Sequence, residues 1–522
     1  MSADQNRPGP GTGSRPGSSA RGGPSARGGS GGPSGPGWSG DDRMNELETT
    51  MWRSERHPQQ SSTICSLIIL DCVPEWDRLV AAHEWATELV PRSRQRVVEP
   101  LVPTGPPVWR TDPHFALSYH LRRMHQGPDG SMDALMTLVQ TLALTPFDRS
   151  RPLWEGTLIE GLDGGRAAYL LKLHHSLTDG LGAIQLMSLV QSRTREHTPD
   201  KPTRLDASGA AGSGVAGSVA GSSSGSRTPE PEYAGEPADD DALSITVDGA
   251  RHTLSQLPSV AAAAADAGIS FARNPSGAAG EALRFAASLR RVLSPPPAPP
   301  SPLLRPRDGR VWVMRTLECP LAQLRAAAKR AGGSVNDAYL AALLGGLRRY
   351  HERHGVDIDE LPITVPVSLR RSDDPMGGNK FAGAMLSAPI GIVDPAERVA
   401  ALRGAILAQL AEPALDSFSV LTPLVNRLPS GVGAAVMGLG AVTDLSASNM
   451  PGLPYDVFMA GARVERVFPF GPLPGVAVMA AMVSHMGTCC IGLNIDGSGI
   501  TDVDVLMESM QEGLDEVLAI GR

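Results

Sequence analysis

Two long stretches dominated by small residues and proline constrain the fold of this 522-residue chain more than any other feature. Residues 1–41 consist mainly of Gly, Pro, Ser and Arg, and residues 197–255 contain the run SGAAGSGVAGSVAGSSSGSRTPEPEYAGEPADDD. Segments so poor in large apolar side chains cannot bury enough surface to offset their ordering entropy, so we expect both to be disordered. The second stretch predicts a linker, because unstructured loops longer than about 12–15 residues are unusual inside a compact domain.

The predicted linker separates two folded blocks. The first block covers residues 42–196 and the second covers residues 309–522, with a helical and Pro-rich connector at residues 256–308. Both blocks mix apolar runs typical of strands with the three- and four-residue apolar spacing typical of helices, which predicts the α/β class. The clearest predicted strands are residues 61–70, 166–174 and 488–496, and the clearest predicted helices are residues 130–146 and 396–411.

Composition narrows the classes of function. The net charge of −8 gives no reason to expect nucleic-acid binding and does not favour adsorption to an anionic membrane. Five cysteines without CxxC spacing are a poor disulfide framework, so a reducing cytoplasm is the expected location. We find neither an uninterrupted apolar run of about 18 residues nor a secretory signal, so no membrane-spanning helix is expected. No His/Cys spacing predicts a metal site.

The segment LLKLHHSLTDGLGAIQLM, residues 170–187, carries the most informative chemistry. The apolar run before His174 is interrupted only by Lys172 and is typical of a buried strand, while the apolar run after Gly180 indicates a helix. Two adjacent histidines therefore stand where a rigid strand ends. A neutral imidazole can accept a hydroxyl proton near pH 7 if a second group fixes its tautomer. Taken alone, the same residues fit a structural pair, with Asp179 as a helix N-cap.

The residues HHSLTDG, at 174–180, resemble the HHxxxDG motif of the coenzyme A-dependent acyltransferase superfamily. The fold that this resemblance implies has two chloramphenicol-acetyltransferase-like α/β subdomains with mixed sheets and an active-site channel between them. Further stretches are similar to the bacterial wax ester synthase/diacylglycerol acyltransferase family, in the order that the family shows. They are RSRPLWE (149–155), SVNDAYLAALLGGLRRY (334–350), VPVSLR (365–370), GGN (377–379), SNMPGLP (448–454) and MAGARVERVFPFGPL (459–473).

The family resemblance implies transfer of a fatty acyl group from acyl-CoA to diacylglycerol or a long-chain alcohol. In that reaction His175 is the general base, His174 and Asp179 position it, and no cofactor is needed because acyl-CoA is itself a substrate. Two alternatives stay open: a same-superfamily acyltransferase for a specialised, polyketide-type alcohol, and a non-catalytic lipid-droplet-associated protein.

The resemblance also implies supporting residues, each of which has a structural alternative. The implied positions are Gly180, Asn336, Asp337, Arg370 and Asn449, with Pro152, Leu153 and Trp154 in the substrate channel. Asp337 follows Ser334 by three residues, which is also the spacing of a helix capping box. Arg370 is the implied partner of Asp179. Trp154 fits packing better than proton transfer, and Asn449 can bind substrate or backbone.

The implied substrates are apolar and reside in membranes or lipid droplets. Because no spanning helix is expected, the prediction is a cytoplasmic protein attached peripherally to the inner face of the membrane or to lipid droplets. Apolar residues near the channel mouth would supply most of the affinity. The sequence predicts no nucleic-acid partner and leaves the oligomeric state open.

Overall fold

The computed structural model describes most of the two blocks and little of the stretches around them. The described residues are 41–55, 60–102, 105–196, 243–251, 296, 298–307, 309, 311–368, 378–379, 381–411 and 443–522. The predicted tail and most of the predicted linker and connector lie outside these residues. Within the predicted linker, residues 243–251 form a helix, and the hydroxyl of Thr246 accepts a hydrogen bond from the backbone N–H of Leu101 at 2.8 Å.

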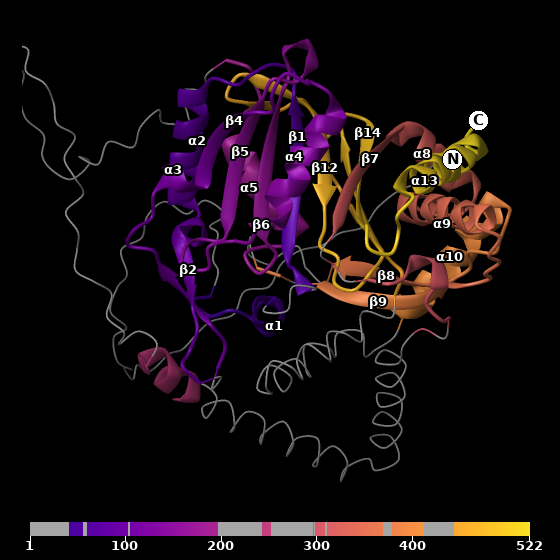
Figure 1. Ribbon diagram of the computed structural model, residues 1–522, viewed down its shortest axis with the longest axis horizontal. Helices are drawn as coiled ribbons and strands as arrows, with labels where there is room; N and C mark the ends of the chain where they lie inside the picture. Colours follow the sequence, from indigo (N-terminus) through magenta and orange to yellow (C-terminus); the bar gives the residue numbers. More distant parts are fainter. Residues whose placement is uncertain are drawn as a thin grey trace, which may run out of the picture. The chain divides into compact units, whose positions relative to one another are not determined.

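A six-stranded mixed sheet organises the first part of the molecule (Figure 1). Its order is β11-β12-β1-β6-β5-β4, and all neighbours are antiparallel except β4 and β5. The strands are β1 (Thr63–Leu70), β4 (Leu121–His125), β5 (Trp154–Glu160), β6 (Ala167–His174), β11 (Phe458–Met459) and β12 (Ala462–Phe470). A separate hairpin pairs β2 (Gln95–Val98) with β3 (Val108–Thr111).

Helices cover both faces of this first sheet. Apolar side chains of α4 pack with alternate residues of β1 such as Leu67 and Ile69 in one buried cluster. Residues of α2 and α5 belong to a second cluster with Ile68 and Leu70, which point to the opposite face because strand side chains alternate. The helices of this part are α1 (Glu46–Ser54), α2 (Trp76–Leu89), α3 (Leu117–His120), α4 (Met132–Leu144) and α5 (Gly180–Val190).

A second six-stranded mixed sheet has the order β7-β14-β13-β10-β8-β9. Its strands β10 and β13, and β10 and β8, run parallel, and the other pairs are antiparallel. The strands are β7 (Trp312–Pro320), β8 (Leu361–Ser368), β9 (Phe381–Ala388), β10 (Leu445–Met450), β13 (Val478–His485) and β14 (Thr488–Asp496). Its helices are α8 (Leu321–Arg330), α9 (Val335–Arg353), α10 (Pro395–Leu410) and α13 (Val503–Ile520).

Helix α9 lies at the centre of the helices that pack with the second sheet, and it contacts α8, α10 and α13. Two glycines allow the closest of these approaches. A Cβ on Gly513 of α13 would collide with the backbone nitrogen of Gly346 in α9. The absence of a side chain there lets the two helices pack backbone against backbone.

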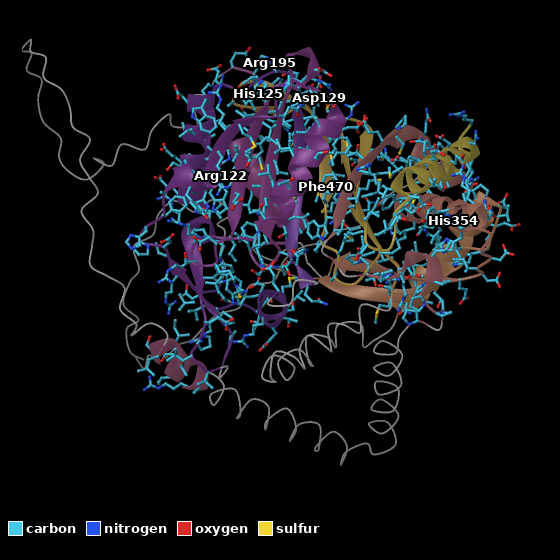
Figure 2. The ribbon with its side chains drawn as sticks, viewed as in Figure 1. Arg122, His125, Asp129, Arg195, His354 and Phe470 are labelled. Carbon is cyan, nitrogen blue, oxygen red and sulfur yellow. The ribbon has the colours of Figure 1, made fainter. Side chains whose placement is uncertain are left out.

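Strand β12 joins the two parts of the chain. It follows the predicted linker by more than 200 residues in the printed sequence, yet it pairs with β1 from Cys65↔Phe470 to Leu70↔Val464. Figure 1 shows it beside β1, and Figure 2 shows the labelled side chain of Phe470 where the two sheets meet. The sheets therefore do not follow the predicted division of the chain at residues 196 and 309, because the second block supplies two strands of the first sheet.

The predicted elements and the mixed α/β class are confirmed. Each of the five predicted segments is a strand or helix of the expected type, with ends that differ by two residues or fewer. Local signals explain the helix starts: Ser131 and Asp394 accept hydrogen bonds from backbone N–H groups in the first turn of α4 and α10. Among the described residues, no helix is long and apolar enough to cross a membrane.

Candidate active site

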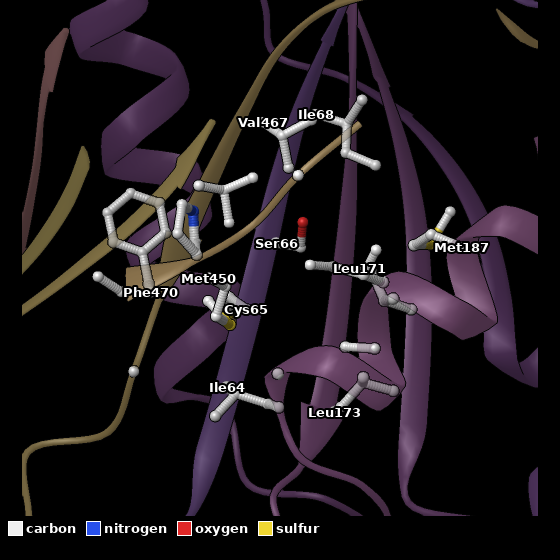
Figure 3. Close-up of a pocket in the computed structure, with 18 of the residues that line it drawn as sticks. Ile64, Cys65, Ser66, Ile68, Leu171, Leu173, Met187, Met450, Val467 and Phe470 are labelled. Atoms are coloured by element: carbon white, nitrogen blue, oxygen red, sulfur yellow. The ribbon is translucent and has the colours of Figure 1, made fainter. Parts of the chain in front are cut away.

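An apolar cavity lies between α5, the first sheet and β10 and β13 of the second sheet (Figure 3). The volume of this cavity is about 140 Å³. Its walls are mostly aliphatic side chains and methionines, with few polar groups. The polar side chains at its wall are those of Ser66, His175, Gln191, Ser448 and His485.

His174 and His175 face different surroundings because they end a strand. Successive side chains of a strand point to opposite sides, so neighbouring histidines at its end diverge. His174 is fully buried, whereas His175 is half-buried and lines the cavity. The doubled histidine of the motif therefore places one ring in the core and one at the site.

Asn379 fixes the tautomer of His175. The Asn379 Nδ2 donates to the backbone carbonyl of His175 at 2.7 Å, which identifies the nitrogen of the amide. Its Oδ1 then faces Nδ1 of His175 at 3.0 Å and can only accept. The neutral His175 ring therefore carries its proton on Nδ1, and Nε2 carries the lone pair that a general base uses.

His174 has the opposite tautomer. The backbone N–H of Ser176 donates to Nδ1 of His174 at 3.1 Å, so Nδ1 must accept. The proton of the neutral ring then lies on Nε2, which is 3.0 Å from Oε2 of Glu55. The rings of Trp52 and Phe147 pack edge-on against this imidazole. His174 is thus committed to Glu55 and holds the end of β6 in place.

Burial and hydrogen bonds shift the pKa of His175 and of Glu55, the partner of His174. Burial lowers the pKa of His175 below its ordinary value, and the hydrogen bond to Asn379 opposes this only in part. His175 is therefore neutral at pH 7. Burial acts to raise the pKa of Glu55, but the hydrogen bonds from His174 and from the N–H of Ser62 outweigh it, so the net pKa is lowered and Glu55 stays ionised.

Helix α1 supports Asn379 from behind. The carboxylate of Glu48 accepts from the backbone N–H of Asn379 at 3.2 Å, and the side chain of Asn45 donates to the Asn379 carbonyl at 3.2 Å. Asn45 and Glu48 also form the capping box of α1. Beside them, Thr178 forms a parallel bridge with Gly378. The histidine loop and the segment 378–379 are therefore held together from two sides.

Asp179 caps α5. Its Oδ1 accepts from the backbone N–H of Gly182 at 2.9 Å, and its backbone is extended as at other N-caps. Asp179 therefore has the N-cap role that was the structural alternative for it. Its pairing with Arg370 stays a prediction, because Arg370 lies outside the described residues. At Gly180 a Cβ would collide with Sδ of Met450, so a larger residue there would force the Met450 side chain to move.

Several predicted site residues lie away from the cavity. Asp337 accepts from the N–H of Ser334 at 2.7 Å and Ser334 answers at 3.2 Å, which makes them the capping box of α9. Asn336 is half-buried in the same first turn. Neither lines the cavity, so among the described contacts the capping role is the one that the geometry supports.

The PLW element is part of the core. Pro152, Leu153 and Trp154 are buried, and none of them is among the residues that line the described cavity. The indole N–H of Trp154 donates to the carbonyl of Ser93 at 2.8 Å, and its ring stacks on His120. The described contacts therefore place these three residues in the packed core and not in the cavity wall, where they were predicted.

The C-terminal motif reaches the cavity through other residues than the predicted one. Asn449 on β10 has an exposed side chain, while its neighbours Ser448 and Met450 line the cavity because strand residues alternate. Leu453, two residues past Pro451, lines it as well.

Sequence reasoning missed the residues that hold the histidines. Glu48, Glu55 and Asn379 are far from the HHxxxDG motif in the chain and carry no spacing signal that links them to it. Only the GGN stretch drew attention to Asn379. Among the described residues, no group of three or more His, Cys, Asp or Glu side chains is placed to hold a metal ion.

Comparison with protein families agrees with this geometry. Residues 43–339 match the wax ester synthase/diacylglycerol acyltransferase catalytic domain, and residues 377–517 match the C-terminal domain of the same enzymes. The chain is 36% identical over 483 residues to a Mycobacterium tuberculosis H37Rv protein that carries the assignment diacylglycerol O-acyltransferase, covering 92% of each chain.

Solved structures share the fold. The wax ester synthase/diacylglycerol acyltransferase of Marinobacter aquaeolei VT8 superposes with a TM-score of 0.58 at 19% identity, over 92% of this chain and 100% of that one. The first condensation domain of the calcium-dependent antibiotic synthetase gives 0.57 at 14% identity, over 93% and 97%. The predicted two-lobed fold is confirmed. The chain belongs to the wax ester synthase/diacylglycerol acyltransferase family and is an acyl-CoA-dependent O-acyltransferase of that type.

Proposed function

We propose that this acyltransferase moves a fatty acyl group from acyl-CoA to diacylglycerol or to a long-chain alcohol, with His175 as the general base. The observation that carries the proposal is an imidazole with its lone pair on Nε2 at the wall of an apolar cavity. A base next to a hydroxyl and an apolar space next to a lipid chain are the two things that this reaction needs.

The chemistry follows from the tautomer. Nε2 of His175 accepts the hydroxyl proton as the acceptor oxygen attacks the thioester carbon, and the C–O bond forms. The C–S bond then breaks, and the imidazolium returns the proton to the departing thiolate of coenzyme A. Nδ1 of His175 keeps its proton throughout and donates it in a hydrogen bond to Oδ1 of Asn379, so the ring keeps its orientation in both protonation states. No covalent enzyme intermediate is required.

The names of similar proteins favour a lipid acceptor. The relative from M. tuberculosis is assigned to diacylglycerol and the structural neighbour from M. aquaeolei to wax esters as well. The aliphatic cavity wall suits either acceptor and suits a compact polyketide-type alcohol less well. A non-catalytic lipid-droplet protein would have no need for two histidines with fixed and opposite tautomers.

Free thiol release by the purified full chain tests the reaction. We expect release of coenzyme A from long-chain acyl-CoA only when diacylglycerol or a long-chain alcohol is present, with the ester product identified by mass spectrometry. His175→Ala should lower turnover about 100-fold or more, because a general base contributes about 10²–10⁴-fold. Turnover above a tenth of wild type in that variant, with an unchanged melting curve, would contradict the role of His175.

The pH dependence of kcat/KM tests the role of Asn379. His175 must be neutral to act as a base, and its pKa is lowered, so the acid limb should have its midpoint below the ordinary histidine pKa of about 6.5. Asn379→Ala removes an acceptor that favours the protonated ring, so the midpoint should move to lower pH. It should also reduce kcat/KM at pH 7 about 10- to 100-fold, because the ring loses its fixed orientation.

The matched control is Gln323→Ala, which removes an exposed amide on α8 and should leave the midpoint of the acid limb where it is. An acid limb that stays in place, or moves to higher pH, in Asn379→Ala would show that Asn379 only supports the fold.

We propose further that Asp179 and Arg370 act as a unit that holds the His175 loop. Asp179→Asn and Arg370→Ala should each lower turnover, and the double variant should be little worse than either single, because residues that act together are not additive. Losses that multiply across the cycle would leave Asp179 with the N-cap of α5 as its whole role.

Peripheral attachment to a membrane or lipid droplet is part of the proposal, and apolar contact is expected to dominate it. With a net charge of −8, attraction to anionic lipid is a weak source of affinity, and each basic residue near a surface contributes only about 1 kcal/mol. Binding to neutral lipid emulsions should therefore persist in high salt and after deletion of residues 1–40, measured by flotation. Complete release at moderate salt would assign the attachment to charge instead.

A further inference from the structure

The sheet side of the cavity is built in regular rungs. Ile64 of β1 pairs with Leu173, Ser66 pairs with Leu171 and Pro469, and Ile68 pairs with Val467. All of these side chains line the cavity. Figure 3 shows Ile64 and Leu173 at one end, Ile68 and Val467 at the other, and Ser66 with Leu171 between them. At about 3.3 Å per residue, the three rungs span about 13 Å.

The helix side is a single stripe of α5. Gly180, Ala183, Ile184 and Met187 of α5 line the cavity at the three- and four-residue steps of one helix face, and Gln191 lines it directly after the helix. With a rise of 1.5 Å per residue, Met187 lies about 10 Å and Gln191 about 16 Å beyond Gly180. The sheet side and the helix side of the cavity therefore extend over similar lengths, as in a channel for an extended chain.

The lining residues near His175 and those near Met187 differ in their exposure. His175, Gly180 and Met450 are half-buried at the end where β6 stops. At the other end Met187, Gln191 and Val457 expose 7%, 8% and 4% of their surface. A chain whose reacting group sits at His175 and that follows α5 would extend toward Met187 and end against these buried side chains.

We propose that α5 and the facing rungs form a ruler for one alkyl chain, with Met187 at its closed end setting the longest chain that fits. The inference rests on the proposed function and adds to it the residues that select chain length. The ligand is the alkyl chain of a substrate whose carbonyl or hydroxyl lies at His175. That chemistry belongs to the acyl donor or to a long-chain alcohol, and the test has one arm for each.

Two variants should move the selectivity in opposite directions. Met187→Ala deepens the closed end, so the ratio of kcat/KM for long over medium chains should rise. Ala183→Leu adds bulk about one turn from Gly180, so the same ratio should fall. One methylene in an apolar pocket changes kcat/KM about 10- to 200-fold, so each shift should be at least ten-fold. Because each ratio is taken within one protein, it is independent of the fraction that folds.

The matched control is Ser188→Leu. Ser188 lies next to Met187 on α5 but is exposed and is not among the residues that line the cavity. It receives the same leucine side chain as Ala183→Leu, outside the channel, and should leave the ratio as in wild type.

The assay is thiol release by the full chain in two arms. One arm varies the acyl-CoA with a fixed alcohol, and the other varies the alcohol with a fixed acyl-CoA. Opposite shifts by Met187→Ala and Ala183→Leu in either arm, with Ser188→Leu unchanged, support the ruler and assign the chain. Unchanged ratios in both arms, or an equal shift in Ser188→Leu, overturn it while leaving the proposed function intact. No thiol release by wild type with any donor overturns both.

Discussion

The antiparallel ladder between β1 and β12 is the interaction on which the rest of the molecule depends. It brings the second block of the sequence into the first sheet, and the chain needs only residues 471–477 to reach β13 in the other sheet. A Cβ on Gly492 of β14 would collide with the carbonyl oxygen of Pro469, so β14 passes directly against β12. Strand β12 thus brings the two sheets together, and residues of β12 and of both sheets line the cavity between them.

A second constraint acts on the paired histidines. Strand alternation sends His174 into the core and His175 to the cavity, and different acceptors then give the two rings opposite tautomers. The Glu55 carboxylate binds the Nε2 proton of one ring, and the Asn379 amide oxygen binds the Nδ1 proton of the other. An amide at Asn379 orients the His175 ring without adding a charge beside it, which is consistent with a His175 pKa that burial keeps low.

Local features of the fold were predictable from the sequence, and the distant ones were not. Apolar periodicity identified β1, β6, β14, α4 and α10, because burial of one face leaves a mark within a few residues. The motif located His174, His175 and Asp179 in the same way. The pairing of β12 with β1 has no local mark, since many apolar strands could take that place. The same holds for Asn379, whose role depends on a contact across 204 residues.

For two residues, the family motifs suggested a role at the site, whereas the structure shows contacts within the core and at a helix start. Trp154 and Asp337 belong to motifs of the family, yet Trp154 is committed to Ser93 and His120, and Asp337 to the start of α9. A motif records that a residue type is needed, not whether chemistry or folding needs it. The alternatives of packing and capping, stated for both residues from their side-chain chemistry, describe these contacts better than the family motif does.

Helix α5 combines the two requirements of the site along its length. Its first turn is tied to the histidine loop through Asp179 and Gly182, and its later turns face the apolar cavity through Ala183, Ile184 and Met187. Hydrogen bonds fix the first part, whereas apolar contacts of adjustable volume form the second. The position of His175 and the shape of the cavity wall are therefore set by different residues of one helix. In the proposed ruler, chain selectivity varies by exchange of side chains at the far end of α5, away from the hydrogen bonds that hold His175.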